Sequence, residues 1–224
     1  MGIEPYTVYE LKKYYNSNIG GIDKLKHENI YLVNNLQSVT DKYNITESTD
    51  NMNGFTVPLN EVIVAVRNNI NGFETMNALF HEFTHAHDFF WFSDKCRIQI
   101  KDISQNYLYH SLQVYSEINA YYLGYKLTIQ FLSQRNPLVK QMCCETMNPI
   151  CDQMDVLSKK EIMFDDIVRC AGYLLFYGYL YDTMDYLGYL PDFVSPRIRG
   201  IIGSILDCYF THNIEEINTI ISMV

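Results

Sequence analysis

The pattern His81-Glu82-Phe83-Thr84-His85 constrains this chain more than any other stretch. On an α-helix, residues four positions apart lie on one face, so His81 and His85 can direct two imidazoles at one metal ion. Glu82 sits at the edge of that face, where it can reach a water bound to the metal without being a ligand itself. The pattern therefore suggests a zinc (Zn2+) site, and it requires a helix around it, a strand before it and a third ligand after it.

The residues around the motif predict a helix over about 73–90. Asn71 can cap its start, and Glu74 follows three residues later, as in a capping box. An apolar stripe is expected to face the core and consists of Met76, Leu79, Phe80, Phe83, Ala86 and Phe90. A separate polar stripe consists of His81, Thr84, His85 and Asp88. One apolar face and one ligand-bearing face are what a buried metal site requires.

The rest of the chain predicts a mainly helical α+β fold with a small N-terminal sheet. Residues 62–66, Val-Ile-Val-Ala-Val, are mostly β-branched and indicate a strand, and Pro58 marks it as an edge strand or lies just before it. Apolar residues spaced by three and four predict a helix over about 27–43. After a connection at 91–106, helical patterns run over about 107–133, 138–156, 158–188, 196–210 and 213–222. We expect a single domain, residues 1–224, with an α/β part (1–92) and a helical part (93–224).

Composition and charge exclude several classes of partner. Hydrophobic residues make up 48% and charged residues 19%, which is typical of a folded globular chain. The net charge of −9 argues against nucleic acid or an anionic membrane as the main partner. The longest uncharged apolar stretch, Ala171–Tyr181, is too short to span a bilayer, and the N-terminus has no apolar signal core. We therefore predict a cytoplasmic protein, and the sequence leaves its oligomeric state open.

Six cysteines are present, and none forms a C-x-x-C pair. Without a signal peptide they are expected to be reduced thiols. Cys143, Cys144 and Cys151 can in principle hold a metal, but their spacing fits no zinc knuckle.

Glu117, 32 positions after His85, is the preferred third ligand. If the motif helix and the next helix pack antiparallel through the 91–106 connection, its carboxylate can face both histidines. Ala120, one turn later on the same face, would let the second helix approach the metal closely. Asp88 and His110 are the alternative ligands.

With Glu117-Ile-Asn-Ala120, the sequence resembles the gluzincin zinc metallopeptidases. In that group H-E-x-x-H on one helix is joined by a Glu on the next helix, often within E-x-x-A. The local string is similar to the ImmA/IrrE type of bacterial and phage peptidase, and the resemblance covers roughly residues 60–125. It implies a zincin-like fold in which His81, His85 and Glu117 bind zinc and Glu82 is the general base. It also implies that the strand at Val62–Val66 lines the cleft and pairs with an extended peptide backbone.

These residues suggest zinc-assisted hydrolysis of a peptide bond in a peptide or protein substrate. Zinc would lower the pKa of a bound water and polarise the carbonyl, and Glu82 would carry the proton to the leaving amine. The oxyanion needs a second donor. His110 is the preferred candidate, with Tyr121, Tyr109 and Tyr115 as alternatives.

Two further readings stay open. Asp88 either orients a ligand imidazole from behind, or it merely caps the helix or faces water. The alternative function is a catalytically inactive zincin-like scaffold that binds a protein partner, with a metal that is structural or absent.

Overall fold

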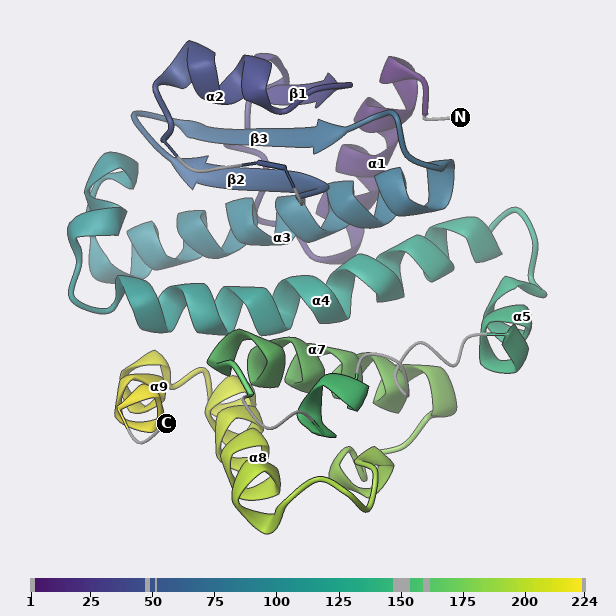
Figure 1. The fold of residues 1–224 in the computed structure, drawn as a ribbon. Coiled ribbons are helices and arrows are strands. Elements are labelled where there is room, and N and C mark those ends of the chain that lie inside the picture. The colour runs from purple at the N-terminus through teal and green to yellow at the C-terminus, as the bar shows by residue number, and fades with distance from the viewer. Residues whose placement is uncertain (1–2, 47–48, 51, 147–153, 159–161, 223–224) are drawn as a thin grey trace. The chain divides into compact units, whose positions relative to one another are not determined.

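The computed structural model describes residues 3–46, 49–50, 52–146, 154–158 and 162–222. They form two compact units, Met1–Asn106 and Tyr107–Val224. The first contains helices and a three-stranded sheet and the second is helical, so the predicted mainly helical α+β class is confirmed (Figure 1). The boundary between the units lies after Asn106, because the segment that follows the motif helix packs back onto that helix and onto the sheet.

The sheet of the first unit has the strand order β1-β3-β2. Strand β1 (Ile30–Val33) pairs parallel with β3 (Val62–Arg67), and β2 (Gly54–Pro58) pairs antiparallel with β3. The predicted strand at 62–66 is therefore confirmed, but it is the central strand. Because β3 has a neighbour on each side, it has no free edge, and the prediction that Val62–Val66 pairs with an extended peptide is wrong.

Helices cover both faces of this sheet. Helix α2 (Gln37–Tyr43) lies over one face, where its residues share a buried cluster with Phe55, Ile63 and Ala65 (Figure 1). Helix α3 (Gly72–Cys96) packs against β2 and β3. Because side chains alternate along a strand, the valines of β3 face α3, and all of them are buried. Helix α1 (Pro5–Asn18) packs on α3, with the Tyr15 and Phe83 rings edge to face at 6.0 Å.

The predicted helix over 27–43 is wrong in its first half. Residues His27–Asn29 form a 3-10 turn (η1), Ile30–Val33 form β1, and only Gln37–Tyr43 are helical. Ile-Tyr-Leu-Val is a short apolar run whose periodicity fits a helix or a strand equally well. Hydrogen bonding to β3 makes it a strand, and this pairing cannot be seen in the local sequence.

Helix α3 matches its prediction and extends beyond it to Cys96. The Asn71 side chain accepts a hydrogen bond from the Glu74 amide at 2.9 Å, so the expected N-cap is present. Every member of the apolar stripe is buried. The helix ends where Arg97 adopts a left-handed conformation, and the 3-10 helix η2 (Ile100–Gln105) follows.

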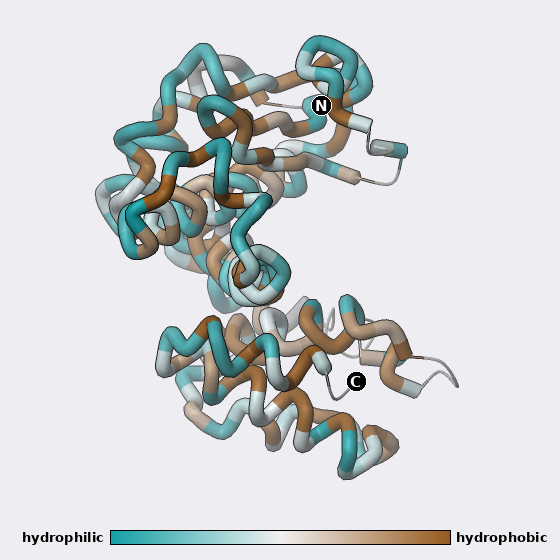
Figure 2. Tube along the Cα trace, turned by 90° about the vertical axis from the view of Figure 1, so that its left-hand side faces the viewer, coloured by the Kyte–Doolittle hydropathy of each residue, from teal (hydrophilic) through white to brown (hydrophobic). Residues whose placement is uncertain are grey.

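The second unit is built from helices that pack side by side, α4 with α5, α7 and α9, and α8 with α7 and α9. Their bounds are α4 Tyr109–Ser133, α5 Val139–Thr146, η3 Asp155–Ser158, α7 Phe164–Tyr181, η4 Leu187–Tyr189, α8 Pro196–Thr211 and α9 Ile214–Ile221. The predictions for 107–133, 196–210 and 213–222 are confirmed, and the one for 158–188 holds for α7. The prediction for 138–156 holds for α5, and its later part lies largely outside the described residues. Hydrophobic and hydrophilic segments alternate along these helices (Figure 2), as expected for amphipathic helices.

Within the described part of the chain, no helix is both long enough and apolar enough to cross a membrane.

Candidate metal centre

The two histidines of the motif lie on one face of α3, as the helical spacing predicts. Their Nε2 atoms are 3.1 Å apart and their ring centroids 4.8 Å apart. Around a tetrahedral zinc with Zn–N bonds of 2.0–2.1 Å, two ligand nitrogens lie about 3.3 Å apart. The spacing of the two nitrogens therefore suits a shared metal ion.

The surroundings of His85 favour the neutral form that binds metals. Protein atoms crowd the imidazole although part of the residue remains exposed, and this burial lowers the pKa of His85 to about 4. The nearby Asp88 carboxylate acts in the opposite direction, and its effect is smaller. Near pH 7 the imidazole of His85 therefore has a lone pair free for a metal.

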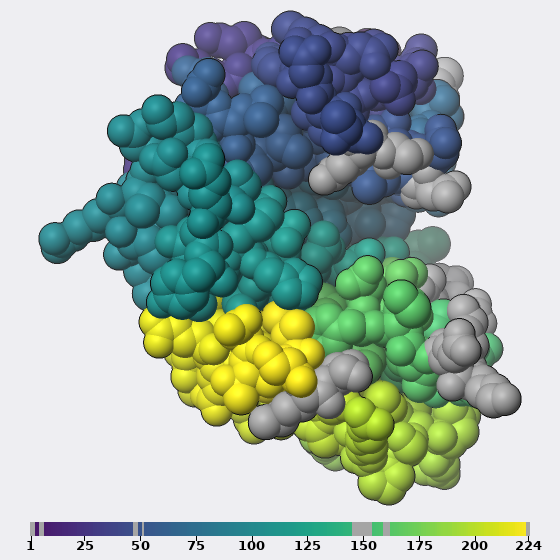
Figure 3. Space-filling view, turned by 60° about the vertical axis from the view of Figure 1, so that its left-hand side comes forward, coloured from purple at the N-terminus to yellow at the C-terminus, as the bar shows by residue number. Residues whose placement is uncertain are grey.

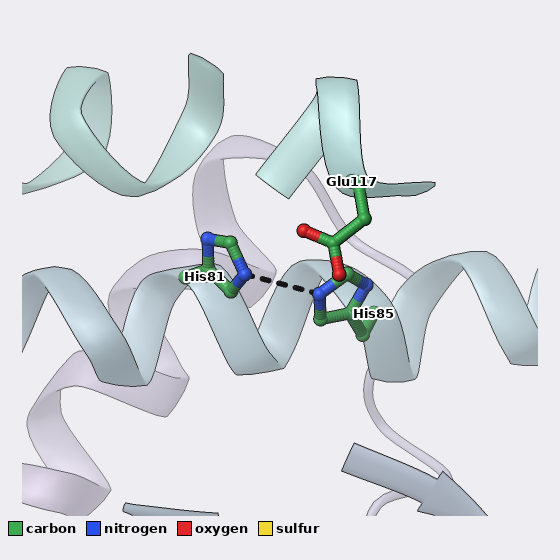
Figure 4. Close-up of side chains that lie close together, drawn as sticks. All are labelled: His81, His85 and Glu117. Atoms are coloured by element: carbon green, nitrogen blue, oxygen red, sulfur yellow. Dashed lines mark hydrogen bonds between the residues drawn. The ribbon is translucent and has the colours of Figure 1, made fainter. Parts of the chain in front are cut away.

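Glu117 of α4 joins the two histidines in a group of potential metal ligands. Each of the three residues offers one ligand atom, and these atoms all lie within 4.8 Å of one another (Figure 4). All three residues are partly exposed. Two imidazole nitrogens and one carboxylate oxygen are a ligand set that zinc accepts, and three protein ligands leave its fourth position open. Cys143 and Cys144 lie in α5, outside this group, and Cys151 lies outside the described residues.

Glu82 points from α3 towards the edge strand β2. The residue is only 5% exposed, and the Thr56 hydroxyl donates to its Oε2 at 2.8 Å and to its main-chain oxygen at 3.0 Å. A Cβ atom built on Gly54 would stand 2.9 Å from Cγ and Oε1 of Glu82. A hydroxyl and a position without a side chain on β2 thus hold this carboxylate in place.

Neither Thr56 nor Gly54 was predicted from the sequence to belong to the site. Thr56 and Gly54 lie in a stretch whose local pattern only suggests an approach to the strand at 62–66. Thr56 is 26 positions from Glu82 in the chain, so only the packing of β2 on α3 reveals the contact.

Asp88 is buried, 1% exposed, and lies near Tyr15 of α1. Its Oδ1 lies 3.0 Å from Nδ1 of His87, and its charge acts on both His85 and Tyr15. Asp88 therefore does not face water, and its role in orienting a ligand imidazole stays a prediction.

His87 packs away from the motif histidines, as the helical geometry predicts. Its ring lies 6.4 Å from the Tyr15 ring and against Gly21. Gly21 has a φ of +79°, and a Cβ there would stand 2.4 Å from Cδ2 of His87, so both the backbone and the space require glycine.

The candidates for the second oxyanion donor are spread over α4. His110 is exposed in the first turn of the helix, next to Tyr109. The Tyr121 ring packs against Tyr173 at 5.4 Å. Tyr115 is buried, and its hydroxyl is 2.7 Å from Nδ1 of His212. None of these residues belongs to the His-His-Glu group, and the assignment of a donor stays a prediction.

Comparison with protein families, with curated proteins and with solved structures finds no match to this chain.

Proposed function

We propose that this protein is a zinc-dependent metallopeptidase with a zincin-like fold of the gluzincin type. The observation that carries the proposal is the grouping of His81, His85 and Glu117, whose ligand atoms lie within 4.8 Å of one another. Zinc accepts this nitrogen and oxygen donor set in catalytic sites, where the fourth position is left for water or substrate. When bound there, zinc supplies a Lewis acid that acidifies a water molecule and polarises a carbonyl.

Glu82 is the general base in this proposal. It follows His81 directly, so its carboxylate lies at the edge of the face that bears the ligands, and Thr56 fixes its orientation. Glu82 takes a proton from the attacking water and delivers it to the amine of the leaving peptide. Glu82 itself is only 5% exposed, so its carboxylate is largely shielded from bulk water.

The edge strand β2 takes the role in substrate binding that the sequence assigned to residues 62–66. In the part of the chain that the structure describes, only β3 pairs with β2, so the other edge of β2 has no strand partner and is the edge that an extended peptide would join, next to η2. The same strand holds Glu82 through Thr56. A peptide added to β2 would therefore run past the base.

The substitution Glu82→Gln tests the mechanism. The variant is expected to bind zinc like the wild type, because Glu82 is not a ligand, and to cleave a random decapeptide library at least 100-fold more slowly, because general base catalysis contributes roughly that much or more. Zinc content is measured by atomic emission after dialysis, and cleavage by mass spectrometry of the new peptide ends. Glu74→Gln is the matched control, since Glu74 is exposed in the first turn of α3.

Glu117→Gln tests the third ligand in the same preparations. Losing one of three protein ligands is expected to weaken zinc binding by at least tenfold, while Glu74→Gln leaves it unchanged.

Wild-type cleavage rates in Glu82→Gln would refute the mechanism. Zinc binding without any cleavage by the wild type would support the inactive scaffold instead.

A further inference from the structure

A pocket of about 650 Å3 lies in the first unit at the end of the edge strand β2. Pro58 and Leu59 form one wall, Lys42 and Asn44 at the end of α2 form a second, and η2 contributes Lys101 and Ser104. Residues of α2, dark blue, and the teal residues that include η2 appear on one face of this unit (Figure 3). The volume is that of a small-molecule or side-chain site.

Two ammonium groups give this pocket a positive charge. The Lys42 ammonium donates to the Tyr31 hydroxyl at 2.7 Å, and no carboxylate of the described residues forms an ion pair with it. Lys101 is exposed, and among the described residues it has no hydrogen-bond or ion-pair partner. Both charges are therefore available to an anion, in a chain whose net charge is −9.

Among the described residues that line the pocket, the one carboxylate is already engaged. Glu61 forms an ion pair with Lys26 and accepts a hydrogen bond from Asn29 at 2.6 Å. These contacts neutralise Glu61, so the two lysines dominate the field in the pocket. Asn60 and Ser104 add neutral hydrogen-bonding groups that can complete the contacts of a carboxylate.

The pocket adjoins the strand that holds the proposed base. Thr56 contacts Glu82, and Pro58, at the pocket wall, is two residues further along β2, or about 7 Å at 3.4 Å per residue. A peptide paired with the edge of β2 opposite β3 would therefore pass the base and reach the pocket a few residues later.

We infer that this pocket binds an acidic side chain of the peptide substrate, two to four residues from the bond that is cleaved. The inference rests on the proposed peptidase function. A single charge pair in a partly exposed pocket should give a preference on the order of tenfold for Asp and Glu over Asn and Gln at one fixed position.

Sequencing the cleavage products of a random decapeptide library tests this inference. The zinc-loaded wild type is expected to show the acidic preference, and Lys101→Glu is expected to abolish it or replace it with a preference for Lys and Arg. Lys101 has no structural partner among the described residues, so this substitution should not disturb folding. Lys13→Glu, the same charge change on an exposed residue of α1, should keep the wild-type preference. An unchanged profile in Lys101→Glu, or a wild type without acidic preference, would overturn the inference.

Failure of the proposed function gives a different result. If the wild type cleaves nothing, that function fails, and the pocket is then judged by capture of the same library on immobilised Glu82→Gln protein. Acidic peptides enriched there, and lost with the added Lys101→Glu change, would keep the pocket as an anion site. Equal recovery of acidic and neutral peptides would remove it.

Discussion

The hydrogen bond from Thr56 to Glu82 gives the most direct test of how β2 supports the proposed base. Thr56→Val keeps the volume and the branched shape of the side chain and removes only the hydroxyl. The Oε2 atom of Glu82, in a residue 5% exposed, then loses a donor at 2.8 Å. Hydrogen bonds to charged groups contribute roughly 1.5–3 kcal/mol, and Thr56 is only partly buried, so we expect the lower end, about 1.5 kcal/mol.

Urea unfolding followed by tryptophan fluorescence measures this loss. The sequence contains a single tryptophan, Trp91, which lies on α3, so the signal reports on the first unit. Thr56→Ser restores the hydroxyl and should recover most of the lost stability. In the zinc-loaded protein, the acid limb of the pH–activity profile of Thr56→Val should move to higher pH, because a carboxylate that loses a donor is protonated more easily.

Two results would refute this reasoning. A Thr56→Val protein as stable as the wild type would show that the hydroxyl contributes no net stabilisation to Glu82. A Thr56→Ser protein as unstable as Thr56→Val would show that the packing of the methyl group, rather than the hydrogen bond, matters at this position.

Three further predictions follow from contacts in the two units. Burial lowers the pKa of His85 from 6.5 to about 4, so in EDTA the unfolded chain takes up a proton at His85 that the folded chain does not. In urea unfolding, the stability should therefore fall by at most about 3 kcal/mol as the pH drops from 6.5 to 4, and His85→Asn should remove this part of the pH dependence. Gly54→Ala should destabilise the protein by about 1–3 kcal/mol and slow cleavage, because its Cβ would stand 2.9 Å from Glu82 and from a β3 carbonyl oxygen. The control Gly200→Ala, whose Cβ would have nothing within 4 Å, should be neutral or stabilising. Equal effects of the two substitutions in urea unfolding would contradict the steric argument. Gly172→Ala should destabilise the second unit, because its Cβ would stand 2.6 Å from a side-chain carbon of α4, and circular dichroism should then show partial unfolding at lower urea than in the wild type.

The parts of the fold that could be predicted are those whose causes are local. Helix α3 has its N-cap at Asn71, an apolar stripe at helical spacing and two histidines four residues apart, and all of these can be read from neighbouring residues. The 30–33 segment could not be predicted in this way. Four apolar residues fit a helix or a strand, and it is the parallel pairing with β3, more than 30 residues away, that selects the strand.

The candidate site divides in the same way. The spacing of His81 and His85 follows from helix geometry alone, and the structure adds only the distance of 3.1 Å between their nitrogens. The surroundings of Glu82 depend on β2, whose place in the sheet, at the edge instead of β3, reverses the expected role of the 62–66 segment. Nothing in the residues near the motif indicates that Thr56 would reach Glu82.

The setting of Glu82, more than the two histidines, favours the proposed peptidase over a structural metal site. Two imidazoles on one helix face bind metal equally well in an enzyme and in a structural site. A buried carboxylate is costly to keep unless its neighbours stabilise it. The chain meets this demand at Glu82 with a hydroxyl at position 56 and a glycine at position 54, both on the edge strand β2. A purely structural metal site needs no stabilised carboxylate beside its ligands, so the way Glu82 is held supports the proposed proton-transfer role.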